Sequence, residues 1–85
     1  MRFKAIINLL EQTGKDFTRF IDGEYIDIQS LLQQAEKWSS GERALIDLAL
    51  SLYSYDHKIN LRDIFQTLDK DNTAQALKAL QDYNS

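Results

Sequence analysis

Residues 39–53 read SSGERALIDLALSLY, and this stretch decides the fold. Ser39 and Glu42 have the spacing of a capping box, in which the serine oxygen accepts from one free helix amide and the glutamate reaches back to another. The residues after this cap are apolar over more than half of a helical circumference: Leu45, Ile46, Leu48, Ala49, Leu50, Leu52 and Tyr53. A helix with so wide an apolar face lies inside a bundle. We therefore expect it to be the central helix, wrapped by the other elements.

Helical periodicity also appears on the N-terminal side of this stretch. A first helix is predicted over residues 2–12, with a left-handed cap at Gly14. Asp27 can cap a second helix that ends near Trp38. The apolar faces of the two helices comprise Phe3, Ile6, Ile7 and Leu10 in the first, and Ile28, Leu31, Leu32 and Ala35 in the second.

Two further helices are predicted on the C-terminal side. Asn60 and Asp63 repeat the capping spacing and open a short helix, whose apolar residues are Leu61, Ile64, Phe65 and Leu68. Residues 69–71 are expected to form a turn. The last helix is predicted from about Asn72 to Tyr83, with Ala76, Leu77 and Leu80 facing inward.

Residues 17–26, FTRFIDGEYI, flank an Asp22-Gly23 pair with aromatic and β-branched side chains. This pattern indicates a β-hairpin with a type I′ turn. An irregular loop stays open as the alternative, because an isolated two-stranded ribbon is marginal in water unless it packs on helices. The fold class predicted for residues 1–85 is therefore mainly α, a single compact domain of four or five helices. Whether residues 17–26 form a short hairpin stays open.

Composition limits the classes of function. Of the 85 residues, 44% are hydrophobic and 27% charged, which is typical of one small globular domain. The chain has no cysteine, which excludes disulfides, thiolate nucleophiles and zinc sites built on sulfur and makes the cytoplasm the expected location. The apolar start is interrupted at Asn8 and ended by Glu11, so we expect no export signal. No apolar run approaches the roughly 20 residues that span a bilayer, so no membrane partner is expected.

Three patterns in the sequence partly match known sites for chemistry. His57 is the chain's only histidine, and it stands beside Ser54 and Asp56, but neighbours in a short loop do not converge as a catalytic triad. We therefore expect an exposed loop histidine there. Ser30-Leu31 has part of the modified-serine pattern of acyl carrier proteins, although Gln29 stands where those proteins have aspartate.

The alternation of Asp69, Asp71 and Thr73 matches the start of a calcium-binding EF-hand loop. The pattern then fails, because Ala74 and Leu80 stand where glycine and glutamate are required. Helix capping by Asp69 or Asp71 is the expected role instead. No catalytic residue, no metal site and no cofactor are predicted, and the protein is expected not to be an enzyme.

Nucleic acid is a disfavoured partner. The net charge is −3, and the basic residues are scattered singly along the chain. Residues 61–83 have the outline of a helix-turn-helix, but the second helix carries Lys78 against Asp82, where a groove-reading helix is usually flanked by several cations. A helix-turn-helix-like nucleic-acid-binding protein is kept as an alternative.

Large aromatic residues dominate protein interfaces, so they are the candidate partner-binding residues. Trp38 and Tyr53 are expected in the core. Tyr55, Tyr83 and Tyr25 are the remaining candidates for contact with a partner.

A resemblance covers about half of the chain. The run from Trp38 to Glu42 and the residues after it are similar to the C-terminal part of small uncharacterised proteins from bacteria and their mobile elements. The further matching positions are Leu45, Leu48, Ala49, Leu52-Tyr53, Leu68-Asp69, Asn72 and Leu77 to Leu80. The resemblance implies a bacterial or phage-related origin, and it transfers no activity, cofactor or site residue.

The function expected from these observations is a non-enzymatic interaction or regulatory module, such as an inhibitor of another protein. An acidic helical surface can meet a basic groove on a partner. A homo-oligomeric structural protein is the other alternative, in which a second copy covers helix faces left apolar by a small fold.

Overall fold

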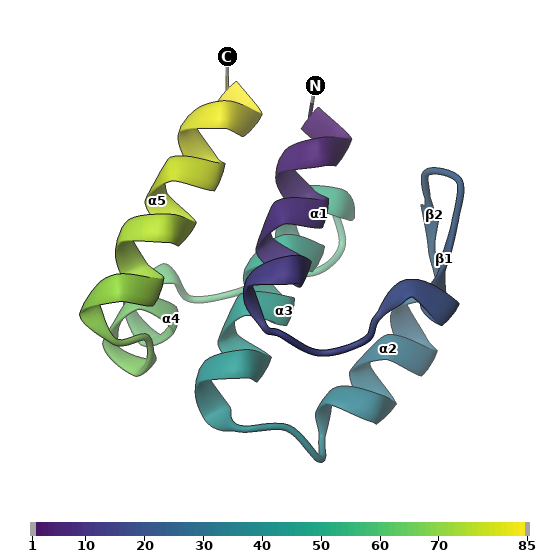
Figure 1. The fold of residues 1–85 in the computed structure, drawn as a ribbon, viewed down its shortest axis with the longest axis horizontal. Helices are drawn as coiled ribbons and strands as arrows, with labels where there is room; N and C mark the ends of the chain where they lie inside the picture. Colours follow the sequence, from purple (N-terminus) through teal and green to yellow (C-terminus); the bar gives the residue numbers. More distant parts are fainter. Residues whose placement is uncertain (1, 85) are drawn as a thin grey trace.

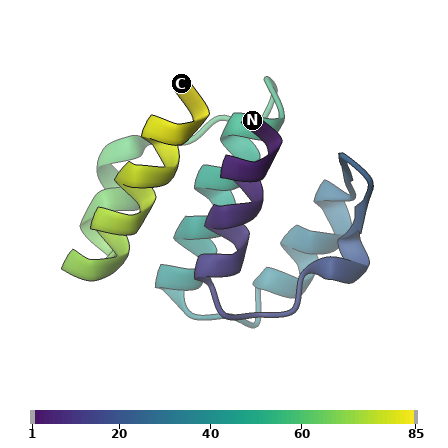
Figure 2. The same ribbon diagram turned by 45° about the horizontal axis from the view of Figure 1, so that its top comes forward.

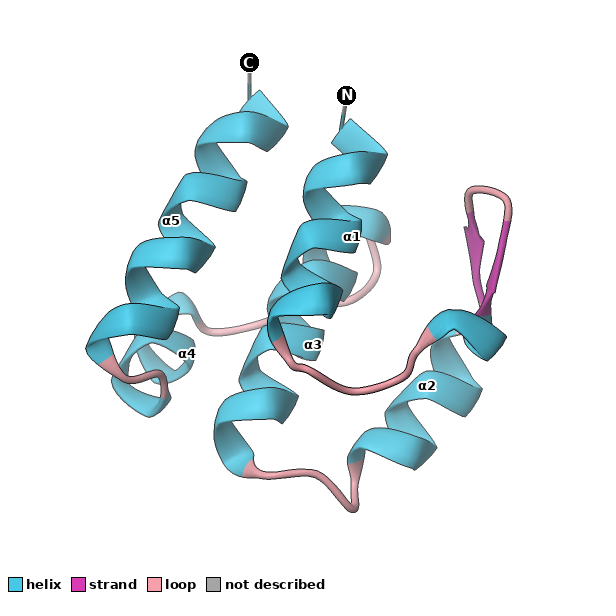
Figure 3. Cartoon of the chain, viewed as in Figure 1, coloured by secondary structure: helices cyan, strands magenta, loops and turns pink. Residues whose placement is uncertain are grey.

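Five α-helices account for most of residues 2–84, the part of the chain that the computed structural model describes (Figure 1). They are α1 (Arg2–Gln12), α2 (Ile28–Ala35), α3 (Ser40–Tyr53), α4 (Leu61–Thr67) and α5 (Lys70–Asn84). A 3₁₀ turn, η1 (Thr18–Phe20), and the strands β1 (Ile21–Asp22) and β2 (Tyr25–Ile26) lie between α1 and α2 (Figure 3). The predicted mainly α domain of four or five helices is confirmed, with five helices, and the segment left open between a hairpin and an irregular loop forms a short hairpin.

Helix α3 has the central place that its apolar face predicts. It packs against α1, α2 and α4, whereas α5 packs on α1 (Figure 2). Helices α1 and α5 run antiparallel, so the start of α1 and the end of α5 lie together at one end of the molecule (Figure 1). The largest fully buried side chains are Leu9, Leu10, Ile26, Leu31, Leu45, Ile46, Leu48 and Leu50.

Helix caps form where the sequence predicts them. Ser39 Oγ accepts from the Glu42 N–H at 3.2 Å, and Glu42 Oε1 accepts from the Ser39 N–H at 2.9 Å, which completes the capping box of α3. Asp27 caps α2 by accepting from the Ser30 N–H, and Asn60 caps α4. Gly14, two residues beyond α1, has φ 71°, the left-handed conformation expected of it.

Two predicted helix boundaries were wrong. Helix α2 ends at Ala35 instead of near Trp38, because the chain tightens into a turn in which the Trp38 N–H donates to the Ala35 carbonyl. Helix α5 begins at Lys70 instead of Asn72, because Asp69 Oδ1 accepts from the Asn72 N–H at 2.8 Å and so caps the helix two residues earlier.

The predicted inward face of α5 is also corrected. Ala76 and Ala79 are buried and Leu80 is partly buried, whereas Leu77 is 49% exposed. Successive helical residues point about 100° apart, and α5 packs against one main neighbour, so only a narrow stripe of it is covered. Small side chains occupy that stripe and Leu77 lies outside it.

The hairpin has a different turn from the one predicted. Ile21 pairs with Ile26 and Asp22 with Tyr25, so the two central residues are Gly23 and Glu24 rather than Asp22 and Gly23. Among the described residues only glycines have positive φ, and Gly23 has φ 62°. Positive φ at the first central residue alone is the pattern of a type II′ turn, not of type I′.

The strands are shorter than the 17–26 pattern suggests, because residues 18–20 form η1 instead of extended strand. Asp16 Oδ1 starts this turn by accepting from the N–H and the hydroxyl of Thr18. Phe17 is buried, and the Asp27 N–H donates to the Phe20 carbonyl at 2.9 Å. This bond joins the two ends of the hairpin to each other, and the burial of Phe17 and Ile26 anchors them in the core.

Candidate protein-interaction surface

The three tyrosines predicted to meet a partner have different surroundings. Tyr55, in the loop after α3, is 89% exposed, and Tyr25, in β2, is 63% exposed. Tyr83, near the end of α5, packs against the core, and its hydroxyl donates to the Leu52 carbonyl at 3.2 Å. Of the three, Tyr25 and Tyr55 are therefore the tyrosines whose side chains are exposed enough to contact another molecule.

A hydrogen bond to the hydroxyl of a third tyrosine links the segments that carry these two rings. Tyr53, the last residue of α3, accepts at its hydroxyl from the Ile26 N–H at 3.0 Å. Tyr25 immediately precedes Ile26, and Tyr55 follows Tyr53 by two residues. The hairpin and the loop after α3 lie toward the same end of the molecule in Figures 1 and 2.

The loop that carries Tyr55 is braced from within. The N–H of Asp56 donates to Ser54 Oγ at 3.3 Å, and the N–H of His57 donates to the Ser54 carbonyl at 3.1 Å. Lys58 Nζ lies 4.3 Å from the centre of the Tyr55 ring. These contacts hold an exposed ring on an ordered loop.

His57 was predicted to be an exposed loop residue, and that prediction was wrong. Its side chain is 19% exposed, and its Nε2 lies 3.2 Å from Oδ1 of Asp47, on α3. The contact joins residues ten positions apart, so no local pattern indicates it. It attaches the loop after α3 to the body of that helix.

We use the name Tyr25–Tyr55 surface for Asp22, Glu24, Tyr25, Tyr55 and Asp56. All five are exposed. None of the hydrogen bonds or ion pairs within the described residues involves the carboxylates of this surface. Of the nearest basic residues in the sequence, Arg19 lies over the Phe20 ring, outside this surface, and Lys58 lies over the Tyr55 ring, within it.

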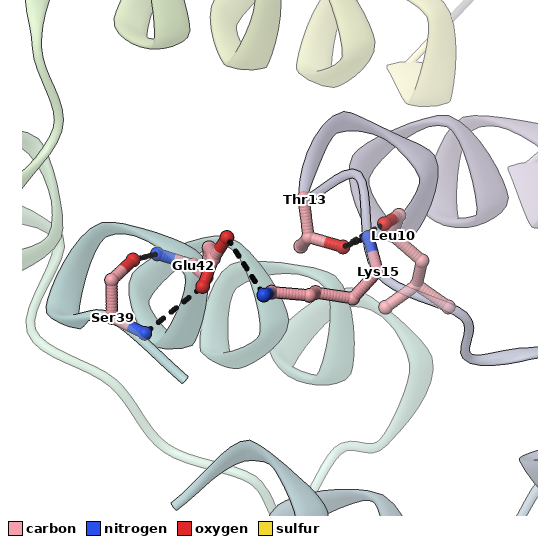
Figure 4. A network of polar contacts seen from close by, with 5 residues as sticks. All are labelled: Leu10, Thr13, Lys15, Ser39 and Glu42. Carbon is pink, nitrogen blue, oxygen red and sulfur yellow. Dashed lines mark hydrogen bonds and ion pairs between the residues drawn. The ribbon is translucent and has the colours of Figure 1, made fainter. Parts of the chain in front are cut away.

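A second polar region lies at the opposite end of α3, around its capping box (Figure 4). Lys15 Nζ approaches Glu42 Oε2 at 3.8 Å, and Thr13 Oγ1 donates to the Leu10 carbonyl at 2.7 Å while accepting from the Lys15 N–H. The Ser39 N–H donates to the Glu42 carboxylate and lowers the pKa of that group, and Lys15 acts in the same direction.

A hollow of about 290 Å³ adjoins this network. Gln12 Nε2 spans part of it and donates to the backbone carbonyl of Asn72 at 2.7 Å and to Asn72 Oδ1 at 2.9 Å. Asp69, considered above as a calcium ligand, caps α5 here, so the expected capping role is confirmed for it. The polar groups of this hollow serve helix ends and the contact between α1 and α5.

The other patterns considered as sites have structural positions. Ser30, which has part of the acyl-carrier pattern, lies in the first turn of α2, and its N–H donates to Asp27. Residues 2–84 hold no group of three or more histidine, aspartate or glutamate side chains placed to bind a metal ion. Over the same residues, no helix combines the length and apolar character that crossing a membrane requires.

Sequence reasoning did not identify two exposed apolar residues. Leu61, at the start of α4, is 53% exposed, and Leu77 on α5 is 49% exposed. Both belong to helical apolar patterns, which predict burial. Only the packing of α4 and α5 at the edge of the bundle reveals their exposure.

Comparisons with known proteins add no relative. The chain matches no protein-family model, no curated protein and no solved structure. The resemblance to small bacterial and mobile-element proteins therefore stays a prediction.

Proposed function

We propose that this protein is a non-enzymatic interaction module that binds another protein through its Tyr25–Tyr55 surface. The observation that carries the proposal is the exposure of two tyrosine rings on segments that the fold braces. Tyrosine supplies a large and rigid contact area at a low cost in conformational entropy. Bracing lowers the ordering cost of association further.

The proposed role is that of a small cytoplasmic regulator or inhibitor of bacterial or mobile-element origin. Its support is the acidic composition, the absence of cysteine and the sequence resemblance described above. In such a role the molecule acts by occupying a surface of its partner, so it needs a stable scaffold and a few anchoring side chains rather than reactive groups.

Affinity purification from a bacterial host, with and without nuclease, tests this function. We expect one reproducible, nuclease-resistant protein partner that is lost with the double variant Tyr25→Ala/Tyr55→Ala. Gln33→Ala/Gln66→Ala is the matched control, because both glutamines are exposed and lie outside the Tyr25–Tyr55 surface. If the double tyrosine variant still binds the partner, the proposed role of this surface is wrong. If nuclease treatment removes the partner, the result favours the helix-turn-helix alternative.

Self-association is the second candidate function, and the exposure of Leu61 and Leu77 favours it. A symmetric interface buries the same patch twice, so modest apolar area on each copy is doubled. Light scattering over a concentration series tests it. A dimer that Leu61→Ser/Leu77→Ser converts to monomer supports this function, and a monomeric mass at the highest concentration removes it.

A further inference from the structure

We propose that the Tyr25–Tyr55 surface binds arginine side chains on a basic surface of its partner protein. This inference rests on the proposed function and adds the chemistry of the partner. Three observations carry it: carboxylates without internal partners, a tyrosine ring that already holds a cation, and a brace that keeps the two halves of the surface together.

The carboxylates give the surface its charge. Asp22 and Glu24 lie on either side of Gly23 in the hairpin turn region, and Asp56 directly follows Tyr55. The three side chains are exposed and make no ion pair or hydrogen bond with the described part of the chain. Their negative charge is therefore available to a partner, and complementary charge steers association and fixes its orientation.

The Tyr55 ring supplies an aromatic face for contact with a cation. Lys58 Nζ lies 4.3 Å from the ring centre, so this ring already accepts a cation within the chain. The side chain is nearly fully exposed, which leaves ring surface for a second contact. A guanidinium group stacks on an aromatic face and binds a carboxylate through two parallel hydrogen bonds, whereas an ammonium group acts as a compact point charge. Adjacent tyrosine and aspartate side chains therefore favour arginine over lysine.

Both halves of the surface fit within one interface. The Tyr53–Ile26 hydrogen bond, together with the reach of two extended residues, keeps the Cα atoms of Tyr25 and Tyr55 within roughly 20 Å. A standard interface covers about 800 Å² on each partner, a patch roughly 30 Å across. One partner surface can thus meet the hairpin and the loop after α3 together.

The test uses two synthetic peptides of equal length and charge, one alternating arginine with glycine and the other lysine with glycine. Each is titrated into the ¹⁵N-labelled full chain and followed by NMR. We expect shift changes concentrated in residues 22–25 and 54–58, with the arginine peptide binding about fivefold or more tightly than the lysine peptide at the same salt concentration. Tyr55→Ala and the triple variant Asp22→Asn/Glu24→Gln/Asp56→Asn should each weaken arginine binding several-fold.

The triple variant Glu11→Gln/Glu36→Gln/Asp71→Asn is the matched control, because it also removes three exposed carboxylates, all of them outside the surface. Thermal unfolding of every variant identifies any loss of fold. Equal binding of the two peptides, shifts spread over the acidic residues of the whole chain, or an equal effect of the control variant overturns the inference. If a partner purifies through Tyr25 and Tyr55 while the arginine peptide fails to bind, the arginine inference falls and the proposed function stands.

Discussion

The hydroxyl of Tyr53 accepts a hydrogen bond from the backbone N–H of Ile26, and this contact joins the end of α3 to the second strand of the hairpin. Ile26 is buried, so its amide has no access to bulk water as an alternative partner. This oxygen is therefore the acceptor that joins the backbone of β2 to the end of α3, and it adds to the apolar packing of Phe20, Ile21 and Ile26 on the core.

Replacing Tyr53 with phenylalanine removes that oxygen and keeps the ring, including its edge-to-face contact with Phe3. We expect a loss of about 1–3 kcal/mol in the free energy of unfolding, because a buried N–H is left without an acceptor. Chemical denaturation measures the loss, and faster amide hydrogen exchange at Ile26 locates it. Tyr55→Phe is the control and should be neutral, and an equal effect of the two variants contradicts this role.

The capping box predicts the effect of changing Ser39. Ser39→Ala removes the oxygen that accepts from the Glu42 N–H, and we expect it to destabilise the protein by about 1 kcal/mol. For a domain of this size, that loss lowers Tm by roughly 4–8 °C. Ser39→Asp keeps an acceptor at the cap and should recover most of the stability. Ser40→Ala changes the neighbouring residue inside the helix, and a Tm loss as large as that of Ser39→Ala argues against capping as the cause.

Glu42 predicts a dependence of stability on pH. The Ser39 N–H lowers the pKa of Glu42 in the folded state below its ordinary value. The stabilising contribution is therefore complete above that ordinary value and is lost as the pH falls through the lower folded pKa. Between about pH 5 and pH 3, the free energy of unfolding of Glu42→Gln should therefore decrease less than that of the unchanged chain. Asp71→Asn is the control, and unfolding curves that fall in parallel for Glu42→Gln and the unchanged chain exclude this origin.

The contact between α1 and α5 predicts that substitutions at two neighbouring positions of α5 change the free energy of unfolding by very different amounts. Ala76 is completely buried on α5, so Ala76→Leu adds volume where none is free and should cost about 1–3 kcal/mol. Leu77→Ala removes a half-exposed side chain and should change the free energy of unfolding by less than about 0.5 kcal/mol. Denaturant titration of the two variants compares them, and a larger effect at Leu77 contradicts the orientation of α5.

Local patterns predicted the elements that depend on local physics. The capping box at Ser39, the cap at Asp27 and the positive φ of Gly14 each involve groups within a few residues, so their chemistry is visible in the sequence. The Asp22-Gly23 pair located the hairpin for the same reason. Its turn type was wrong because pairing between the strands, rather than the dipeptide, sets the two central residues.

The features that sequence reasoning missed depend on distant contacts. The Tyr53–Ile26 and His57–Asp47 contacts join residues 27 and 10 positions apart, and no periodicity relates them. Leu77 shares a helical apolar pattern with buried residues, but only the position of α5 at the edge of the bundle decides which side is covered. For the candidate surface, the sequence proposed three tyrosine residues, and packing distinguishes the partly buried Tyr83 from the exposed Tyr25 and Tyr55.

The antiparallel arrangement of α1 and α5 brings the start of α1 close to the end of α5. The guanidinium carbon of Arg2 lies 5.3 Å from the centre of the Tyr83 ring, so the first and last helical turns touch. A short flexible linker can join the two ends, and new ends can be opened between Gly23 and Glu24, where the backbone is exposed. Such a permuted chain keeps every helix intact and divides only the hairpin, so it isolates the hairpin's contribution to partner binding from that of the bundle.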